Sequence, residues 1–344
     1  MTPKTGHEVA SEQVSKASSC ERNATDNRPK AVLCPLCHKP SEPWFQGTDL
    51  FYEVTDFMGS YWYCPACDFG FMNPVPCRET IASFYPGGYW QESKKAGLLS
   101  RLEDLYVRSI LRMDLYRWVR RGLAFSGFKG HYVDLGCSRG DLAASFKNSG
   151  VMVSGVDGDA RAVSYARECH NLHVEQADLE TWEPETSFQT ISAFHVLEHV
   201  REPIVFLKQL HRCMSEGAHL VLRVPNSGSW QAKAFKKSWK GWELPRHISH
   251  FTPASLRKSL EIAGFKVVSM STWSLRDGPP AMTSSLLRWG EPTWQLIKQR
   301  PNSLLKVLYL LLNSLLIPIE VIAAMLGRGA MLTVICRPKP QKGR

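Results

Sequence analysis

Residues 133–141, VDLGCSRGD, constrain the fold of this 344-residue chain more than any other part of its sequence. The apolar run HYVDLG leads into two glycines, Gly136 and Gly140, and the segment DLAASFKNSG follows them. Buried strands consist of continuous apolar residues, and glycine lets the backbone turn sharply and approach a ligand closely. The stretch therefore predicts a buried strand, a tight turn able to hold a ligand, and a helix that ends at Gly150.

A carboxylate follows this turn at a distance typical of nucleotide-binding sites. The next apolar segment, VMVSGVD, ends at Asp157, 21 residues beyond Gly136. A carboxylate at the end of the second strand is placed to accept hydrogen bonds from both ribose hydroxyls of an adenosine group. The turn and Asp157 together favour a nucleotide-containing cofactor over an ordinary strand-to-helix connection.

Strand-like and helix-like segments alternate through the rest of the chain. The further apolar segments that we interpret as strands are LHVEQAD, FQTISAFHVLEHV, EGAHLVLRVPN, KVVSMSTW and MLTVICRP. One helix between them is expected to begin at Thr252 as its N-cap, with Pro253 in the first helical position and Gly264 after its end. This alternation predicts an α/β protein with a doubly wound sheet.

Two cysteine pairs near the start of the chain have the spacing of a metal site. Cys34 and Cys37 lie in CPLC, and Cys64 and Cys67 lie in CPAC. Two such pairs are typical of a tetrahedral four-thiolate zinc ion, and four protein ligands leave no open position for a substrate. We therefore expect a structural Zn²⁺ in a small zinc ribbon, with FYEVTDF and YWYC as short strands.

Composition and motifs divide the chain into five parts. The first 30 residues are polar and lack the apolar core of a signal peptide, which predicts a cytoplasmic protein without a disulfide framework. In chain order, the expected parts are a disordered tail (1–30), the zinc ribbon (31–78), a helical linker or lid (79–125), the cofactor-binding core (126–275), and apolar, basic helices with a final strand (276–344).

Five stretches of the core occur together in an order and spacing that resemble one enzyme family. They are VDLGCSRG, GVDGDARAVSYA, FHVLEHVREP, LRVPN and HISHFTPASLRKSLEIAGFKVV. The pattern is similar to class I S-adenosylmethionine-dependent methyltransferases, in particular the branch with the ubiquinone-pathway O-methyltransferases and many methyltransferases of glycan and lipid gene clusters. The resemblance implies a seven-stranded Rossmann-like methyltransferase sheet whose last strand pairs antiparallel to the sixth. YWYCPACDFGFMNPVP likewise resembles the N-terminal zinc-ribbon module often joined to such domains.

The resemblance also implies how S-adenosyl-L-methionine is bound. In the family, the glycine turn holds the methionine part, the acid at the end of the second strand binds the ribose, and the acid after the third strand contacts the adenine amine. The matching residues are Asp134, Gly136 and Gly140 for the turn, Asp157 for the ribose and Asp178 for the adenine. Ser138 departs from the family, which more often has glycine there, and its small side chain is expected to be tolerated.

Methyl transfer to a hydroxyl group calls for a base near the methyl group, since the hydroxyl must lose its proton. His195 is the catalytic candidate, because it lies where the fourth strand ends and an imidazole can accept a proton near neutral pH. The alternative is that His195 lines the cofactor pocket without taking a proton. Glu198 and His199 are expected to fix the turn, whereas His247 and His250 are left open between a substrate wall and packing.

These patterns predict a methyltransferase acting on a small-molecule acceptor, namely a glycan, a lipid or a quinone-type intermediate. Two alternatives stay open: an RNA methyltransferase whose ribbon grips RNA, and a non-catalytic scaffold that keeps the fold. The retained cofactor acids argue against a scaffold. The ribbon argues against nucleic acid, because between Cys34 and Cys67 Lys39 is the only Lys or Arg and there are four carboxylates. The segment WQAKAFKKSWKGW is interpreted as a mobile flap with a solvated basic face.

An apolar stretch near the C-terminus, residues 307–327, is about as long as a membrane-spanning helix. Pro318 and Glu320 interrupt it, and a final strand that returns to the sheet would exclude a single crossing. From Arg276 onward there are 10 Lys/Arg and 3 Asp/Glu, which gives +7 of the total net charge of +10. We expect one or two helices that either pack on the domain or lie against an anionic membrane, and both alternatives stay open.

Overall fold

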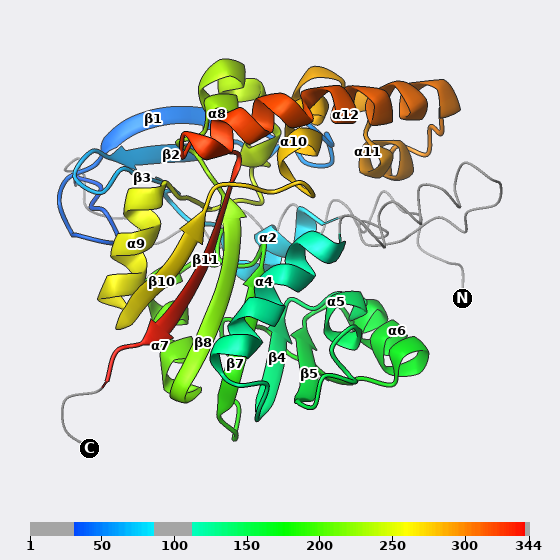
Figure 1. Cartoon of the computed structure of the whole chain (residues 1–344). Helices are drawn as coiled ribbons and strands as arrows, with labels where there is room; N and C mark the ends of the chain where they lie inside the picture. Colours follow the sequence, from blue (N-terminus) through cyan, green and yellow to red (C-terminus); the bar gives the residue numbers. More distant parts are fainter. Residues whose placement is uncertain (1–30, 86–111, 341–344) are drawn as a thin grey trace, which may run out of the picture.

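The computed structural model of the chain describes residues 31–85 and 112–340, and a seven-stranded sheet forms its core (Figure 1). Its strands are β4 (His131–Leu135), β5 (Met152–Asp157), β6 (His173–Gln176), β7 (Phe188–Phe194), β8 (Met214–Pro225), β10 (Phe265–Ser271) and β11 (Met331–Pro338). The predicted tail (1–30) and most of the predicted linker (86–111) lie outside the described residues.

The strands lie in the order β10-β11-β8-β7-β4-β5-β6. All of them are parallel except β11, which runs antiparallel to both β8 and β10. The chain therefore winds outward in two directions from β4 and β7, which confirms the predicted doubly wound, seven-stranded methyltransferase sheet. In such sheets ligands bind at the carboxyl ends of the strands where the winding direction changes.

Helices cover both faces of this sheet (Figure 1). On one face lie α4 (Arg112–Phe125), α5 (Asp141–Ala144) and α6 (Ala160–His170), and on the other α7 (Pro203–Arg212) and α9 (Pro253–Ile262). Because strands covered on both faces keep their side chains from water, most residues of β4 and β7 are buried. As predicted, the hydroxyl of Thr252 caps α9 by accepting from the backbone N–H of Ser255.

The helix after the glycine turn is shorter than the sequence predicts. α5 ends at Ala144, and the chain continues to Gly150 in turns. The hydroxyls of Ser145 and Ser149 each donate to the backbone carbonyl three residues earlier. Serine competes with helical hydrogen bonding in this way, and the two serines account for the early end of the helix.

A second, antiparallel sheet carries the cysteine pairs. Its strands, in spatial order, are β1 (Glu42–Gly47), β2 (Gly59–Cys64), β3 (Phe69–Met72) and β9 (Ser249–His250). The prediction of a strand at residues 51–57 is wrong, because Asp49 accepts hydrogen bonds from the backbone N–H groups of Tyr52 and Val54 and bends this segment into a loop. β9 belongs to the core part of the chain, so a core segment completes the ribbon sheet.

A buried ion pair joins the ribbon to the core. Arg246, which precedes β9 and is 1% exposed, contacts both carboxylate oxygens of Asp49 at 2.8 and 3.0 Å. The rings of Phe69 on β3 and Phe251, 5.2 Å apart, form another contact between ribbon and core. Removing one partner of a buried ion pair is strongly destabilising, so Arg246 and Asp49 hold the ribbon on the core.

The lysine- and tryptophan-rich segment packs into this junction. It forms α8 (Trp230–Phe235) and two short 3₁₀ helices, η2 (Lys236–Ser238) and η3 (Lys240–Trp242). Trp239 and Trp242 are buried in a cluster with Tyr61 and Met72 of the ribbon. The interpretation of this segment as a mobile flap is therefore wrong, because Trp239 and Trp242 form part of the core between the two sheets.

The C-terminal part forms a helical layer and then returns to the sheet. Its elements are α10 (Gly278–Leu286), η4 (Arg288–Gly290), α11 (Pro292–Ile297) and α12 (Ser303–Met325), which precede β11. The apolar stretch is thus a single helix that continues through Pro318. α12 packs along α10 at the end of the molecule where the parallel strands have their carboxyl ends (Figure 1).

Candidate functional site

The predicted glycine turn leaves β4 with three residues in the left-handed region of backbone conformation. Gly136, Ser138 and Gly140 have φ angles of 66°, 48° and 75°. A Cβ atom at Gly136 would lie 2.8 Å from a methyl group of Val196, and one at Gly140 would lie 2.8 Å from a methyl group of Leu172. Conformation and space both require glycine at these two positions, whereas Ser138 holds a conformation that glycine would reach at lower cost.

Asp157 lies beside this turn at the end of β5. Its Oδ2 accepts a hydrogen bond from the backbone N–H of Ser138 at 2.7 Å, and its Oδ1 accepts one from Asp159 at 2.9 Å. Burial raises the pKa of Asp157 above its ordinary value, and the backbone donors oppose this rise. A carboxylate offers about four lone-pair positions, so Asp157 can also accept bonds from ligand hydroxyl groups.

The two other predicted acids have different surroundings. Asp134, within β4, is buried and accepts a hydrogen bond from the hydroxyl of Ser192. Burial raises the pKa of Asp134 to about 7. Asp178, after β6, is half-exposed and pairs with Arg78 of α2 (Arg78–Ser83) at 2.7 Å. Asp178 therefore faces a cation from the N-terminal part of the chain.

His195 follows β7 and is held between two carboxylates. Its Nδ1 lies 3.2 Å from Oε1 of the fully buried Glu198, and its Nε2 lies 3.3 Å from Oδ2 of Asp277. Burial alone would lower the pKa of His195, but Asp277 and Glu198 outweigh this effect and raise it to about 9. In this arrangement the imidazole carries a proton at neutral pH.

Sequence reasoning missed the charged network behind His195. Arg223 of β8 is 0% exposed, and its guanidinium contacts Asp277 at 2.8 Å and Asp114 of α4 at 3.0 Å. The neighbouring His195, together with Arg276 and Arg223, holds the pKa of Asp277 well below its usual range, although burial opposes the shift. The sequence did contain one indication of this network, namely the arginine inside the apolar segment EGAHLVLRVPN. A charged residue in a buried strand requires partners of opposite charge.

The other histidines surround Glu198. A carboxylate oxygen of Glu198 and ring nitrogens of His199 and His247 lie within 4.8 Å of one another. Nδ1 of His199 lies 3.0 Å from the carbonyl oxygen of Arg246. His250 lies in β9, packed against Tyr61 and Trp242, and burial lowers its pKa to about 3. The surroundings of His250 are those of a packed core residue.

The core site residues gather at one edge of the sheet. The side chains nearest to a Cβ atom at Gly136 are those of Val196 and Leu179, which adjoin His195 and Asp178 in the sequence. The turn, Asp157, Asp178 and His195 therefore all lie at the carboxyl ends of β4 to β7. This edge is where ligands bind in doubly wound sheets.

The four predicted metal ligands also come together. Sγ of Cys34 lies 3.8 Å from that of Cys67, Sγ of Cys37 lies 3.6 Å from that of Cys64, and all four lie within 4.8 Å of one another. A tetrahedral zinc ion with Zn–S bonds of ~2.3 Å places its sulfur atoms ~3.8 Å apart, so the cluster is compatible with structural zinc. Nζ of Lys258 on α9 donates to Cys67 at 3.0 Å, and a cation there suits thiolate ligands.

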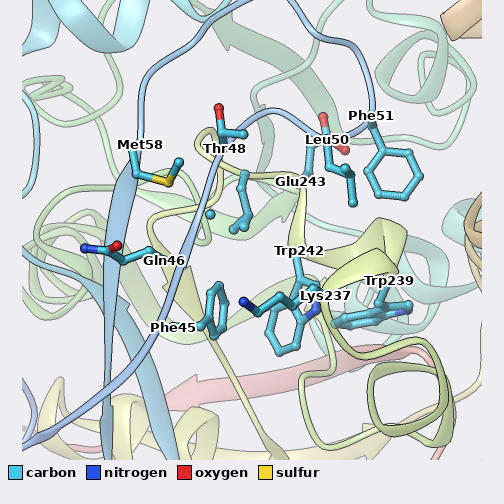
Figure 2. A pocket seen from close by; sticks show the side chains of 12 residues that line it. Phe45, Gln46, Thr48, Leu50, Phe51, Met58, Lys237, Trp239, Trp242 and Glu243 are labelled. Carbon is cyan, nitrogen blue, oxygen red and sulfur yellow. The ribbon is translucent and has the colours of Figure 1, made fainter.

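An apolar pocket with a volume of about 260 Å³ opens between the ribbon and the core (Figure 2). The ribbon segment that contains Phe45, Phe51 and Met58 forms one wall, and the segment with Trp239 and Trp242 forms the other. A concave, mostly apolar lining with a few polar groups is typical of small-molecule sites.

The pocket wall is connected to the histidines at the sheet edge. Glu243 lines the pocket and lies 3.6 Å from Nε of Arg246. The backbone of Arg246 in turn contacts His199, which follows Glu198, the partner of His195. The pocket therefore lies a few contacts from the edge where the predicted site residues gather.

Comparison with known proteins identifies one domain. Residues 108–270 match a family model described as a methyltransferase domain. The chain is 26% identical over 223 residues to a ubiquinone biosynthesis O-methyltransferase of Rhodopseudomonas palustris, an alignment covering 59% of this chain and 85% of the relative. It is 27% identical over 179 residues to the enzyme of that name from Ralstonia nicotianae, covering 48% and 71%.

Solved structures give weaker similarity. A magnesium protoporphyrin IX methyltransferase from Synechocystis with bound S-adenosylhomocysteine aligns with a TM-score of 0.43 at 18% identity, over 56% of this chain and 90% of that one. An O-methyltransferase from a polyketide synthase of Brevibacillus brevis, in complex with S-adenosyl-L-homocysteine, aligns with a TM-score of 0.45 at 13% identity, over 70% and 77%.

Proposed function

Because the chain carries an S-adenosylmethionine-dependent methyltransferase domain, we propose that it methylates a hydroxyl group on a small molecule with an apolar part. The observation that carries this proposal is the arrangement at the carboxyl edge of the sheet. There the glycine turn and the Asp157 carboxylate adjoin each other, with His195 at the neighbouring strand end.

The turn and two carboxylates bind the cofactor in this proposal. The backbone turn at Gly136 and Gly140 approaches the methionine part, and glycine is needed at both positions because a Cβ atom would collide with Val196 or Leu172. Asp157 accepts hydrogen bonds from the ribose hydroxyls through lone pairs that the backbone N–H groups leave free. Asp178, at the next strand end, accepts from the adenine amine and exchanges part of its pairing with Arg78 for this contact.

His195 is the proposed general base. S-adenosylmethionine supplies an activated methyl group when bound, and the protein's part is to align the acceptor and remove its proton. Glu198 accepts from Nδ1 of His195 and orients the ring, which leaves Nε2 as the nitrogen that takes the proton. Nε2 faces Asp277 in this structure, so the ion pair between them must open, or the imidazole must lose its proton, before the ring can act.

The apolar pocket favours an acceptor with an apolar tail, and hence a lipid or quinone-type intermediate over a glycan. Aromatic side chains from the ribbon and from the segment with η3 line it, among them Phe45, Trp239 and Trp242. RNA is disfavoured because two of the three tryptophans of the basic segment, Trp239 and Trp242, are buried and unavailable for stacking on bases.

We expect methyl-labelled S-adenosylmethionine to label a catechol with an isoprenoid tail at a KM at least about tenfold below that of the catechol without the tail. The reason is that each buried methylene contributes ~0.8 kcal/mol. Met58→Glu, at an exposed position of the pocket, should raise the KM of the tailed catechol and leave that of the short one unchanged. Equal KM values for both catechols, or label found only in added RNA, would count against this acceptor class.

A further inference from the structure

Three polar side chains of α12 point into the protein. Its fully or nearly buried residues include Tyr309, Asn313 and Glu320, which lie along one stripe of the helix. The hydroxyl of Tyr309 lies 2.9 Å from that of Ser284 on α10. Glu320 accepts hydrogen bonds from the side chain of Gln231 and from a backbone N–H group, and burial raises its pKa to about 7.

Most of the exposed side chains of α12 are apolar, although Leu316 and Ala323 are buried on the inner face. The exposed apolar positions recur every three or four residues along the opposite stripe: Leu304, Val307, Leu308, Leu311, Leu315, Ile319, Ile322 and Met325. Of these, Leu304, Leu315 and Met325 are 78%, 76% and 81% exposed. A surface helix in water has the reverse pattern, with apolar residues facing the core and polar residues outside. Contiguous exposed apolar surface of this kind marks an interaction site.

Both ends of α12 are attached to the domain. At its start, Asn302 accepts from the backbone N–H of Leu305 and donates its own backbone N–H to Gln295 of α11. After its end, the carbonyl of Arg328 accepts from Trp230, and the chain enters β11. Among the described residues, α12 is the one helix long and apolar enough to cross a bilayer. Because both ends stay on the domain, the helix lies along the surface and does not cross.

Cations border this apolar stripe. Lys306 lies on α12, exposed Arg300 precedes the helix and exposed Arg328 follows its end. Arg288 and Lys298, in the layer before α12, pair with the carboxylate of Glu53 in the ribbon. The one carboxylate of α12, Glu320, is buried and adds no exposed negative charge. Arg337 does not belong to this surface, because β11 carries it to the opposite end of the sheet (Figure 1). The surface near α12 is therefore both apolar and basic.

We propose that α12 is a docking helix that lies in the plane of an anionic lipid bilayer. Its outward leucines enter the boundary between headgroups and acyl chains, and the bordering cations contact anionic headgroups. A bilayer matches both features, since it offers an apolar layer beneath a negative surface. Glu320 is no obstacle, because it faces Gln231 within the protein. This inference concerns location and is independent of the reaction catalysed.

Flotation of the full-length protein with lipid vesicles tests it. We expect binding to vesicles of phosphatidylcholine with phosphatidylglycerol, weaker binding as sodium chloride is raised, and little binding to phosphatidylcholine alone. Leu311→Gln/Leu315→Gln should weaken binding on the order of 100-fold, because each buried leucine contributes about tenfold or more. Both positions are exposed, at 63% and 76%, so the fold should tolerate the change.

Met152→Gln/Ile262→Gln is the matched control, because both residues are exposed and lie away from α12. This variant should bind vesicles like the wild type. Equal vesicle binding by the Leu311→Gln/Leu315→Gln variant would overturn the proposal. The proposal would also be overturned if the wild type bound neither kind of vesicle and eluted as a dimer, while the Leu311→Gln/Leu315→Gln variant eluted as a monomer. That result would show that a second copy of the chain covers this face.

Discussion

His195→Ala is expected to lower turnover by about 10²–10⁴-fold while the affinity for S-adenosylmethionine changes little. General-base catalysis contributes rate enhancements of this size, and the imidazole lies between Glu198 and Asp277 at the sheet edge. Single-turnover kinetics with labelled cofactor, together with calorimetric cofactor affinity, separates the two effects. A small loss of turnover with weakened cofactor binding would instead assign His195 to the pocket wall.

The pH dependence of kcat/KM provides a second readout of the same residue. The pKa of His195 is raised to about 9, and a base must be unprotonated to act. Activity should therefore rise with pH towards about 9, since only ~1% of a group is unprotonated two units below its pKa. Asp277→Asn removes one of the two carboxylates that raise this pKa, so the rising limb should move to lower pH.

His173→Ala is the control for both experiments, because His173 is exposed and lies at the opposite end of the sheet, where β6 begins. Its turnover and pH profile should match those of the wild type. A pH profile that is the same in wild type and Asp277→Asn would show that the group titrating in catalysis is not His195.

Cys64→Ser is expected to remove zinc from the protein and unfold the ribbon. Cys64 is 0% exposed and its sulfur lies 3.6 Å from that of Cys37, so a hydroxyl cannot replace the thiolate without losing a ligand. Free energies of about 10–16 kcal/mol accompany zinc binding in zinc-finger peptides, and in such sites this energy is the folding energy. Elemental analysis should find one zinc per wild-type chain and close to none in the variant.

Cys169→Ser provides the matched control, because Cys169 is an exposed free thiol on α6. This variant should keep its zinc and its thermal transition. Zinc retained at one per chain in Cys64→Ser, or a freshly purified wild type without zinc, would exclude a four-thiolate site. Loss of zinc should also destabilise the core, because β9 of the core completes the ribbon sheet and Arg246 of the core pairs with Asp49 of the ribbon.

The sheet could be predicted from the sequence because its signals are local. Continuous apolar segments mark the buried strands, and Thr252 followed by Pro253 marks the start of α9. The glycine turn could also be predicted from the sequence, since the backbone conformation and the neighbouring side chains both require glycine at Gly136 and Gly140. The spacing of the two cysteine pairs likewise predicted that their four sulfur atoms come together.

What could not be predicted depends on contacts between distant residues. Asp49 and Arg246 are unremarkable charges in the sequence, and only the fold brings them together as a buried pair. Asp277 reaches His195 because α10 begins at the carboxyl edge of the sheet. The sequence also does not show which way Glu320 of α12 points. A carboxylate in an apolar stretch indicates a helix that cannot enter lipid, whereas in the structure Glu320 points inward and accepts a hydrogen bond from Gln231.

The most direct test of the central claim is calorimetric titration of the zinc-loaded full-length protein with S-adenosylmethionine. We expect one cofactor per chain for the wild type and for the exposed-site control Glu216→Ala. Asp157→Ala should weaken binding by ~1.5–3 kcal/mol, because the variant lacks the carboxylate that we propose accepts from the ribose. Unchanged affinity in Asp157→Ala, or no binding by a folded wild type, would contradict the placement of the cofactor at the glycine turn.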